Sequence, residues 1–516
     1  ISALGGDTID KRGLVGMDDY LRTLPGVNMQ DRGAGQNSVV IRSLAVNPQL
    51  ESSTVGIYFG EIPMADLGGS GTNGQSGNSD IKLVDVERIE VLRGPQGTLY
   101  GSGSMGGTVR VIPVAPNTQN IEGSLKARYS RTTDSGGNNH MVQGVLNVPL
   151  IEDTLAVRAV AYGFDNSGYI DNTAASAPTS ALQDAIDAGG VARDQTELGG
   201  DEYTGFRLAT LWTPSSELDV TLTYIDQDID QQGQPESNLD LPNDYQQQRL
   251  GVGVDGAQRE RLASELQVTN LVANYDLGWA QISSSSSWLE YQSFSDSDLS
   301  VLSAAFLGGA SMPYYNQGEK ELEMFTQELR LSSALEGNVQ FVAGLYLEDR
   351  DSDSLQTWSW SGDSALDPAP GLNLFNIPGA ESLEQQALFG EITYAATERL
   401  ALTLGARYFD YERKVESGFT AFASSAPLNS AVEVEENDTI YKVNASYDLS
   451  DDTLVYGQWG EGFRLGAGLA DPSPDSLCDP DGNGLIDELG IPRPTQTDSD
   501  RSESIEFGLK TQWLDR

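Results

Sequence analysis

The segment RLALTLGARYF, residues 399–409, alternates between two kinds of side chain with a period of two. One face of the extended chain carries Leu400, Leu402, Leu404 and Ala406, and the opposite face carries Thr403, Gly405 and Arg407. The segment ELDVTLTY, residues 217–224, repeats this pattern. A tilted β-strand of about ten residues crosses a bilayer. The pattern therefore predicts strands with one face toward lipid and the other toward an aqueous interior.

Two size classes of connection separate these strand segments. Tight turns are expected at residues 149–154, 213–217, 334–338, 395–399 and 449–453. Long polar excursions are expected at residues 165–202, 226–262, 349–384, 411–437 and 464–502. Outer-membrane barrels combine short periplasmic turns with long extracellular loops, whereas a soluble sandwich has no reason to sort its connections by length. The predicted fold class is therefore mainly β, a large antiparallel transmembrane barrel.

The number of strands bears on how much of the barrel this sequence contains. We count about fourteen segments from residue 121 onward, and a barrel with a domain in its lumen has about 22 strands. We therefore expect about eight C-terminal strands to lie outside this sequence. The chain begins at Ile1 with neither an initiator Met nor a signal segment, and it ends at Arg516 directly after an alternating stretch.

The first part of the chain has a different character, being rich in glycine and mixed in pattern. Residues 17–26, MDDYLRTLPG, predict a short amphipathic helix. Short apolar strands are expected at residues 38–44, 54–63, 85–94 and 108–113. We therefore expect a small mixed α/β domain over residues 1–115, a linker over residues 116–120, and the barrel over residues 121–516.

The composition excludes several classes of protein. The 516 residues include 31 basic and 76 acidic side chains, so the net charge is 31 − 76 = −45, and a nucleic-acid partner would be repelled. No apolar run approaches the roughly 20 residues of a membrane-spanning helix. The single cysteine, Cys478, rules out an internal disulfide and a cysteine-based zinc cluster within these residues.

The segment DVERIEVLRGPQGTLYGSGSMGGTVRVIP, residues 85–113, closely resembles the plug domain of TonB-dependent outer-membrane receptors. Further segments that resemble this family occur in order along the whole chain, at residues 8–27, 39–44, 55–63, 325–333, 387–408, 447–466 and 502–515. The resemblance implies that the N-terminal domain fills the lumen of the barrel. It also implies a location in the outer membrane of a Gram-negative bacterium, in contact with its lipid.

The resemblance further implies active import of a scarce, bulky solute. The plug would block the lumen until an inner-membrane TonB complex pulls on a segment N-terminal to Ile1. By family frequency the expected cargo is an iron–siderophore complex, while oligosaccharides, cobalamin and other chelates stay open. A passive channel and a non-transporting adhesin or structural protein are the alternatives. No cofactor is required, and catalysis is not expected, because no plausible set of catalytic groups is present.

Two local features resemble catalytic or cofactor motifs but do not support them. Gly101, Gly103 and Gly106 form a G-x-G-x-x-G pattern, yet the β-branched stretch that follows predicts a strand, whereas a dinucleotide site needs the N-terminus of a helix. We therefore expect a turn inside the plug. The only histidine, His140, lies in a polar stretch and is expected to be solvated.

Four charged residues form a candidate lock between plug and barrel. Arg42 and Arg93 stand where the family places plug arginines, and Glu328 and Glu391 are the matching barrel carboxylates by resemblance. Buried guanidinium groups need such partners. We expect these four residues to form one cluster; the alternative is that they are ordinary solvated charges in the lumen.

The segment DPDGNGLIDELG, residues 479–490, resembles the start of a calcium-binding loop. The candidate Ca²⁺ ligands are Asp479, Asp481, Asn483, Leu485 through its carbonyl, and Asp487. The pattern departs at the twelfth position, where Gly490 replaces the bidentate glutamate. An acidic surface turn without a metal is therefore the alternative.

Overall fold

The computed structural model describes most of the chain, and the structural statements below concern those residues. They are residues 2–31, 33–44, 53–64, 80–252, 260–303, 311–360, 373–421, 428–468, 485–486, 491–492 and 496–511. None of the helices found in these ranges has the length and apolar character needed to cross a membrane.

The N-terminal part forms a small mixed α/β domain around a five-stranded sheet, with strand order β1-β6-β7-β4-β5. Its elements are β1 Ser2–Gly5, α1 Gly6–Arg12, α2 Met17–Leu21, β2 Val27–Asp31, β3 Asn37–Ile41, β4 Val55–Phe59, β5 Ile62–Pro63, β6 Val86–Arg93, α3 Gly97–Tyr100 and β7 Gly107–Pro113. The strands predicted at residues 38–44, 85–94 and 108–113 are confirmed, the first of them ending at Ile41. The stretch 54–63, predicted as one strand, is divided into β4 and β5 by a turn at Gly60, where φ is +62°. The predicted helix is shorter than expected. We call this domain the plug.

Helix α1 was not predicted from the sequence. It is a helix of seven residues that ends at Arg12 and is followed by Gly13, where φ is +69°. Only Ile9 of this helix is buried, so its sequence has little of the apolar periodicity from which a helix is predicted.

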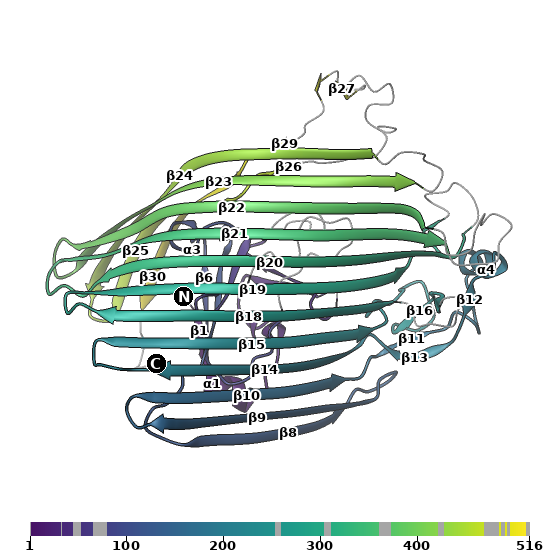
Figure 1. Cartoon of the computed structure of the whole chain (residues 1–516), viewed down its shortest axis with the longest axis horizontal. Coiled ribbons are helices and arrows are strands. Elements are labelled where there is room, and N and C mark those ends of the chain that lie inside the picture. The colour runs from purple at the N-terminus through teal and green to yellow at the C-terminus, as the bar shows by residue number, and fades with distance from the viewer. Residues whose placement is uncertain are drawn as a thin grey trace.

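The rest of the chain forms one antiparallel sheet of fourteen strands, in agreement with the number counted from the sequence. The strands are β8 Glu122–Arg131, β9 Asn138–Ile151, β10 Leu155–Asn166, β14 Gly200–Trp212, β15 Leu218–Gln232, β18 Arg261–Asp276, β19 Ala280–Asp298, β20 Tyr314–Ser333, β21 Val339–Trp360, β22 Asn373–Ala395, β23 Leu400–Ala421, β24 Leu428–Ser450, β25 Thr453–Arg464 and β30 Asp500–Thr511. They lie side by side in chain order from β8 to β30 and curve around the plug (Figure 1). Within the described residues the two end strands, β8 and β30, do not pair with each other.

Smaller elements occupy the connections at one end of the sheet. They are β11 Ile170–Asn172, α4 Ser180–Asp187, β12 Val191–Ala192, β13 Gln195–Leu198, β16 Gln246–Gln247, β17 Gly251–Val252, β26 Ala467–Gly468, β27 Leu485–Ile486, β28 Ile491–Pro492 and β29 Gln496–Thr497. The five predicted tight turns all lie at the opposite end of the sheet, as expected for the periplasmic side.

Two of the predicted long excursions are wrong, because the strands continue through them. Residues 349–384 include the outer halves of β21 and β22, and residues 411–437 include those of β23 and β24. The period of two persists in these halves, but the outward row changes from Leu345 and Leu347 to Asp349, Asp351 and Asp353. An apolar outer face is needed only at the depth of the hydrocarbon, so strands of 22 residues continue as charged strands beyond it.

The two faces of the sheet differ as the sequence predicted. Leu404 is 55% exposed and Leu388 is 58% exposed on the outer face, whereas Arg407 and Phe409 on the same strand as Leu404 are buried. On the inner face, apolar side chains of β15, β18, β19 and β20 join the core of the plug in one continuous cluster. The plug is therefore packed against the inside of the wall.

The predicted turn in the G-x-G-x-x-G stretch is confirmed. Gly101 and Gly103 have φ values of +73° and +78°, and strand β7 follows at Gly107. No helix begins at these glycines, so the phosphate-binding geometry of a dinucleotide site is absent from this described segment.

Candidate functional site at the plug and barrel interface

A buried ion-pair cluster joins the loop before β6 to two barrel strands. Arg158 on β10 donates to the Asp85 carboxylate from Nε at 2.8 Å and from Nη2 at 2.6 Å, and Arg207 on β14 donates from Nη2 at 2.9 Å. The three side chains are only 6–8% exposed. Glu122 on β8 accepts from Arg158 at 3.0 Å, so two carboxylates balance two guanidinium groups. We call these four residues the Asp85 cluster.

A second set of polar contacts fastens the same plug segment to the wall. The hydroxyl of Tyr203 on β14 donates to the Asp80 carboxylate. The Lys82 ammonium lies 3.6 Å from that carboxylate and 3.5 Å from the centre of the Tyr203 ring. Gln227 on β15 donates to the Asp80 carbonyl at 3.1 Å. Buried groups of this kind must find partners, and these partners lie across the interface.

A third contact lies on another side of the barrel. Glu61, in the turn between β4 and β5, accepts from Arg110 of the plug at 3.0 Å and also pairs with Arg330 of β20. Arg330 in turn contacts Glu328, its neighbour on the inner face of β20, at 2.7 Å. The plug is thus held by ion pairs to the adjacent strands β10 and β14 and to β20, which lies four strands further along the sheet.

The predicted four-residue lock is wrong in its pairings. Arg42 pairs with Glu506 on β30, and Arg93 donates to the carbonyl of Pro25 at 3.0 Å and to Ser2 at 3.3 Å. The two predicted carboxylates are satisfied within the barrel, Glu328 by Arg330 and Glu391 by Lys442 at 2.8 Å. Only the general expectation that a plug arginine pairs with a barrel glutamate holds, and it holds for Arg42.

A small cavity lies between the plug and strands β20 to β23. It is lined by residues of both parts, including Gly56, Tyr58, Tyr100 and Gly101 of the plug and Glu328, Tyr346, Glu348 and Arg407 of the wall. Burial raises the pKa of the Tyr58 hydroxyl, so this group stays protonated and donates to the Tyr100 carbonyl at 2.9 Å. Tyrosine, glutamate and arginine side chains make the cavity polar, and its lining residues are buried or half-buried.

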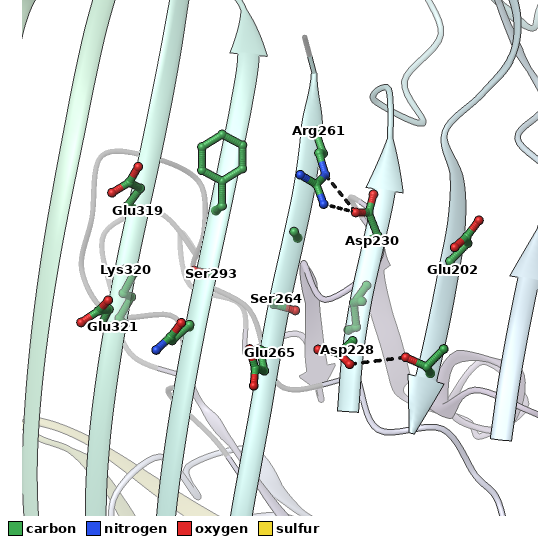
Figure 2. A pocket seen from close by; sticks show the side chains of 15 residues that line it. Glu202, Asp228, Asp230, Arg261, Ser264, Glu265, Ser293, Glu319, Lys320 and Glu321 are labelled. Carbon is green, nitrogen blue, oxygen red and sulfur yellow. Dashed lines mark hydrogen bonds and ion pairs between the residues drawn. The ribbon is translucent and has the colours of Figure 1, made fainter. Parts of the chain in front are cut away.

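The outward side chains of the barrel strands form an acidic surface beyond the apolar band. A depression of about 580 Å³ crosses β14, β15, β18, β19 and β20, and Figure 2 shows its lining. Six carboxylates line it, those of Glu202, Asp228, Asp230, Glu265, Glu319 and Glu321. Glu202 and Thr204 continue the exposed row of Phe206 and Leu208, which identifies this as the outer face. Arg261 pairs with Asp230.

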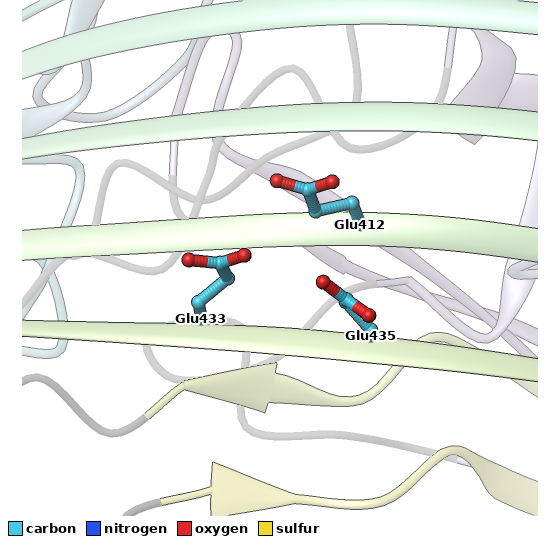
Figure 3. Close-up of side chains that lie close together, drawn as sticks. All are labelled: Glu412, Glu433 and Glu435. Atoms are coloured by element: carbon cyan, nitrogen blue, oxygen red, sulfur yellow. The ribbon is translucent and has the colours of Figure 1, made fainter.

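The acidic surface continues around the barrel to β23 and β24. Glu412, Glu433 and Glu435 lie close together there, with one carboxylate oxygen of each within 4.8 Å of the others (Figure 3). All three side chains are exposed, and Glu412 stands opposite Glu435 in the strand register. Exposed acidic groups of this kind need no bound cation, because water and salt screen their repulsion.

The extracellular connections contain a buried charge cluster of their own. Glu260 is 1% exposed and accepts from Arg249 at 2.9 Å, and Arg249 also donates to Glu236 at 2.9 Å. The Asp298 carboxylate, at the end of β19, accepts from the backbone N–H of Leu250 at 2.6 Å. Burial, reinforced by the negative charge of Asp298, raises the pKa of Glu260 to about 7. This cluster ties the loop after β15 to the end of β19.

The calcium prediction is not addressed by these contacts. Asp479, Asp481, Asn483 and Asp487 lie outside the described residues, and of Leu485 only the backbone, in β27, is described. The Ca²⁺ loop therefore stays a prediction.

Comparison with known families matches both parts of the chain. The family model described as the TonB-dependent receptor plug domain matches residues 1–108. The model described as the β-barrel of TonB-dependent receptors matches residues 212–516, more than half of the chain. The chain belongs to the TonB-dependent receptor family. Members of this family are receptors of the Gram-negative outer membrane, which is where this receptor is located.

Individual relatives of this TonB-dependent receptor are distant. The pesticin receptor of Yersinia enterocolitica is 23% identical over 467 residues, which cover 88% of the chain and 58% of that receptor. A probable TonB-dependent siderophore receptor, PirA of Acinetobacter baumannii, is 31% identical over 163 residues, covering 30% of the chain and 21% of that protein. The pesticin receptors match this chain over most of its length, but the chain covers less than two thirds of the length of those receptors.

Solved structures share the fold of this TonB-dependent receptor. The ferric yersiniabactin uptake receptor FyuA of Yersinia pestis superposes with a TM-score of 0.78 at 16% identity, covering 100% of the chain and 70% of FyuA. The ferripyoverdine receptor of Pseudomonas aeruginosa gives a TM-score of 0.63 at 17% identity, covering 100% of the chain and 61% of that receptor.

The residues that fasten the plug were mostly missed in the sequence. Arg158 and Arg207 do carry a signal, because each interrupts an apolar stretch at an inward position of its strand. An arginine at such a position needs a buried carboxylate. Nothing in the sequence indicates that this carboxylate is Asp85, because the pairing spans 73 and 122 residues of the chain.

Proposed function

We propose that this receptor imports an iron–siderophore complex across the outer membrane, driven by a TonB complex of the inner membrane. The long outer connections and the outer end of the plug would capture the cargo. Force applied to the plug would then open a path along the wall. No catalytic step by this chain is part of the proposal.

The observation that carries this proposal is the way the plug is fastened. Buried ion pairs at Asp85 and a partly buried pair at Glu61 join it to strands on different sides of the barrel. Moving the plug off the wall would also expose the apolar side chains of β15, β18, β19 and β20 that belong to its core. Thermal motion alone would therefore seldom free the plug, and an external source of work is needed.

The comparisons support the choice of cargo. Proteins with similar sequences are described as pesticin and siderophore receptors, and similar structures are described as uptake receptors for ferric yersiniabactin and ferripyoverdine. Oligosaccharides and cobalamin have no such support among these relatives. A passive channel is disfavoured by the seated plug, and an adhesin would need no plug fastened in this way.

Uptake of radiolabelled iron tests the proposal. The full-length protein is expressed in a Gram-negative strain that lacks its own siderophore receptors, and cells are offered a panel of ferric siderophores. We expect saturable uptake of at least one complex, which stops when tonB is deleted or the proton motive force is dissipated. Uptake that persists without TonB would favour the passive channel. Absence of both binding and uptake across the panel would contradict an iron–siderophore cargo.

A further inference from the structure

Arg407, on the inner face of β23, is a buried cation with unused hydrogen-bond donors. Its residue is 2% exposed, and among the described parts of the chain it has neither a hydrogen bond nor an ion pair. Its Nε is fully enclosed and has no partner. A guanidinium group carries five N–H donors, and leaving such a donor unsatisfied in the interior is costly.

The surroundings of Arg407 stabilise its charge but satisfy none of its donors. The rings of Tyr346 and Phe389 lie 5.4 and 5.3 Å from the guanidinium carbon. These cation–π contacts attract the charge but do not replace the hydrogen bonds that its N–H donors lack. On the plug side stands Gly101, with φ +73°, and a Cβ built there would lie 2.9 Å from Nη2 of Arg407. The guanidinium thus reaches into space that only a glycine leaves open.

That space is part of the cavity between the plug and strands β20 to β23. Its volume is about 60 Å³, where roughly 10 to 15 Å³ of such space holds one water molecule, so the cavity has room for a group of a few heavy atoms. The carboxylates that line it are already engaged. Glu328 contacts Arg330 at 2.7 Å, and Glu348 accepts from Tyr346 at 3.0 Å and lies 3.8 Å from Arg350.

We propose that this cavity is a binding site for one carboxylate group, held by the edge of the Arg407 guanidinium. A planar carboxylate matches the donor fork of arginine, fits a cavity of this size and supplies the missing counter-charge. The group is either a free small carboxylate or the carboxylate arm of a chelate in transit along the wall. The existence of the site does not depend on the proposed import.

Formate is the probe that tests the site. Saturation-transfer NMR on the purified full-length protein in detergent measures transfer from protein protons to the formate proton. We expect saturable transfer in the wild type and at least a tenfold loss in the Arg407→Gln variant. Arg261→Gln, which removes a half-exposed arginine on the outer face, is the matched control and should leave the transfer unchanged.

A second variant covers the possibility that Arg407→Gln disturbs the seating of the plug. Arg407→Lys keeps a positive charge beside the Tyr346 and Phe389 rings, so the plug should stay seated, but it lacks the planar donor fork, so it too should lose formate binding. Equal transfer in the wild type and in both variants, or none in the wild type, would overturn the proposal.

A competition arm identifies the source of the carboxylate. Ferric citrate that displaces formate shows that a chelate arm reaches the site. Formate transfer that is unchanged by ferric citrate and competed only by acetate shows that the site takes free anions.

Discussion

Replacing Asp85 by asparagine should loosen the plug more than any other single charge removal at the interface. The substitution keeps the shape of the side chain but leaves Arg158 and Arg207 facing a neutral group in a site where all three side chains are less than 10% exposed. Breaking a buried pair in this way costs about 3 to 5 kcal/mol. Since about 1.4 kcal/mol corresponds to a tenfold change in an equilibrium constant, the open population of the plug should rise about a hundredfold to a thousandfold or more.

The labelling rate of a buried thiol measures this population. Val109 lies in the centre of the plug sheet and is 0% exposed, so a Val109→Cys substitution in a Cys478→Ser background gives one thiol that reacts only when the plug opens. The matched control is Asp10→Asn. Asp10 also pairs with a barrel residue, Lys126 at 2.6 Å, but the two side chains are 60% and 41% exposed. Exposed pairs contribute at most about 1 kcal/mol, so labelling should change less than about fivefold.

The comparison between the two aspartate variants tests whether burial of the ion pair holds the plug in place. If Asp85→Asn and Asp10→Asn accelerate labelling by the same factor, burial of the ion pair is not what holds the plug, and the reasoning from desolvation is refuted.

Three further predictions use the same protein. Because burial raises the pKa of Glu260 from 4.5 to about 7, the stability of its loop should be highest below pH 4.5 and fall by up to about 3 kcal/mol as the pH rises to 7. Protease cleavage within residues 233–252 should therefore be slowest below pH 4.5 and faster at pH 7, and Glu260→Gln should remove this pH dependence. Gly101→Ala should accelerate thiol labelling more than Gly26→Ala, because both glycines have φ +73° but only Gly101 faces the Arg407 side chain. Equal acceleration by the two variants would mean that only the backbone strain matters and that contact with Arg407 does not. Arg42→Ala should change labelling less than about fivefold, because its ion pair with the barrel is 38% and 30% exposed, and a larger effect would mean that this pair is a principal fastening.

The architecture could be predicted because its signals are local. A strand with an apolar outer face is predicted by apolar residues at alternate positions, such as Leu402 and Leu404. A tight turn is predicted by a few consecutive polar residues. The ends of the strands could not be predicted in this way. Beyond the hydrocarbon layer the outward row becomes acidic, as at Asp349 and Asp351, and the same alternation then resembles a polar loop.

The fastening of the plug could be predicted only in part. The sequence shows which residues are charged and which strand positions face inward, but not how the plug is rotated within the barrel. Arg42 and Glu506 are separated by 464 residues, and their contact depends on that rotation. Arg407 lacks a hydrogen-bond partner because neighbouring carboxylates such as Glu328 pair with other residues. Only the three-dimensional arrangement shows those pairings.

A disulfide tether between plug and barrel tests most directly whether the plug must move for import. The backbone N–H of Leu465 donates to Ser102 Oγ at 3.3 Å, so cysteines at these two positions lie within reach of each other. In a Cys478→Ser background, the oxidised Ser102→Cys, Leu465→Cys protein should bind its ferric siderophore at the cell surface but import none, and a reductant should restore import. Uptake at the wild-type rate with the bridge shown intact by mass spectrometry would contradict the account.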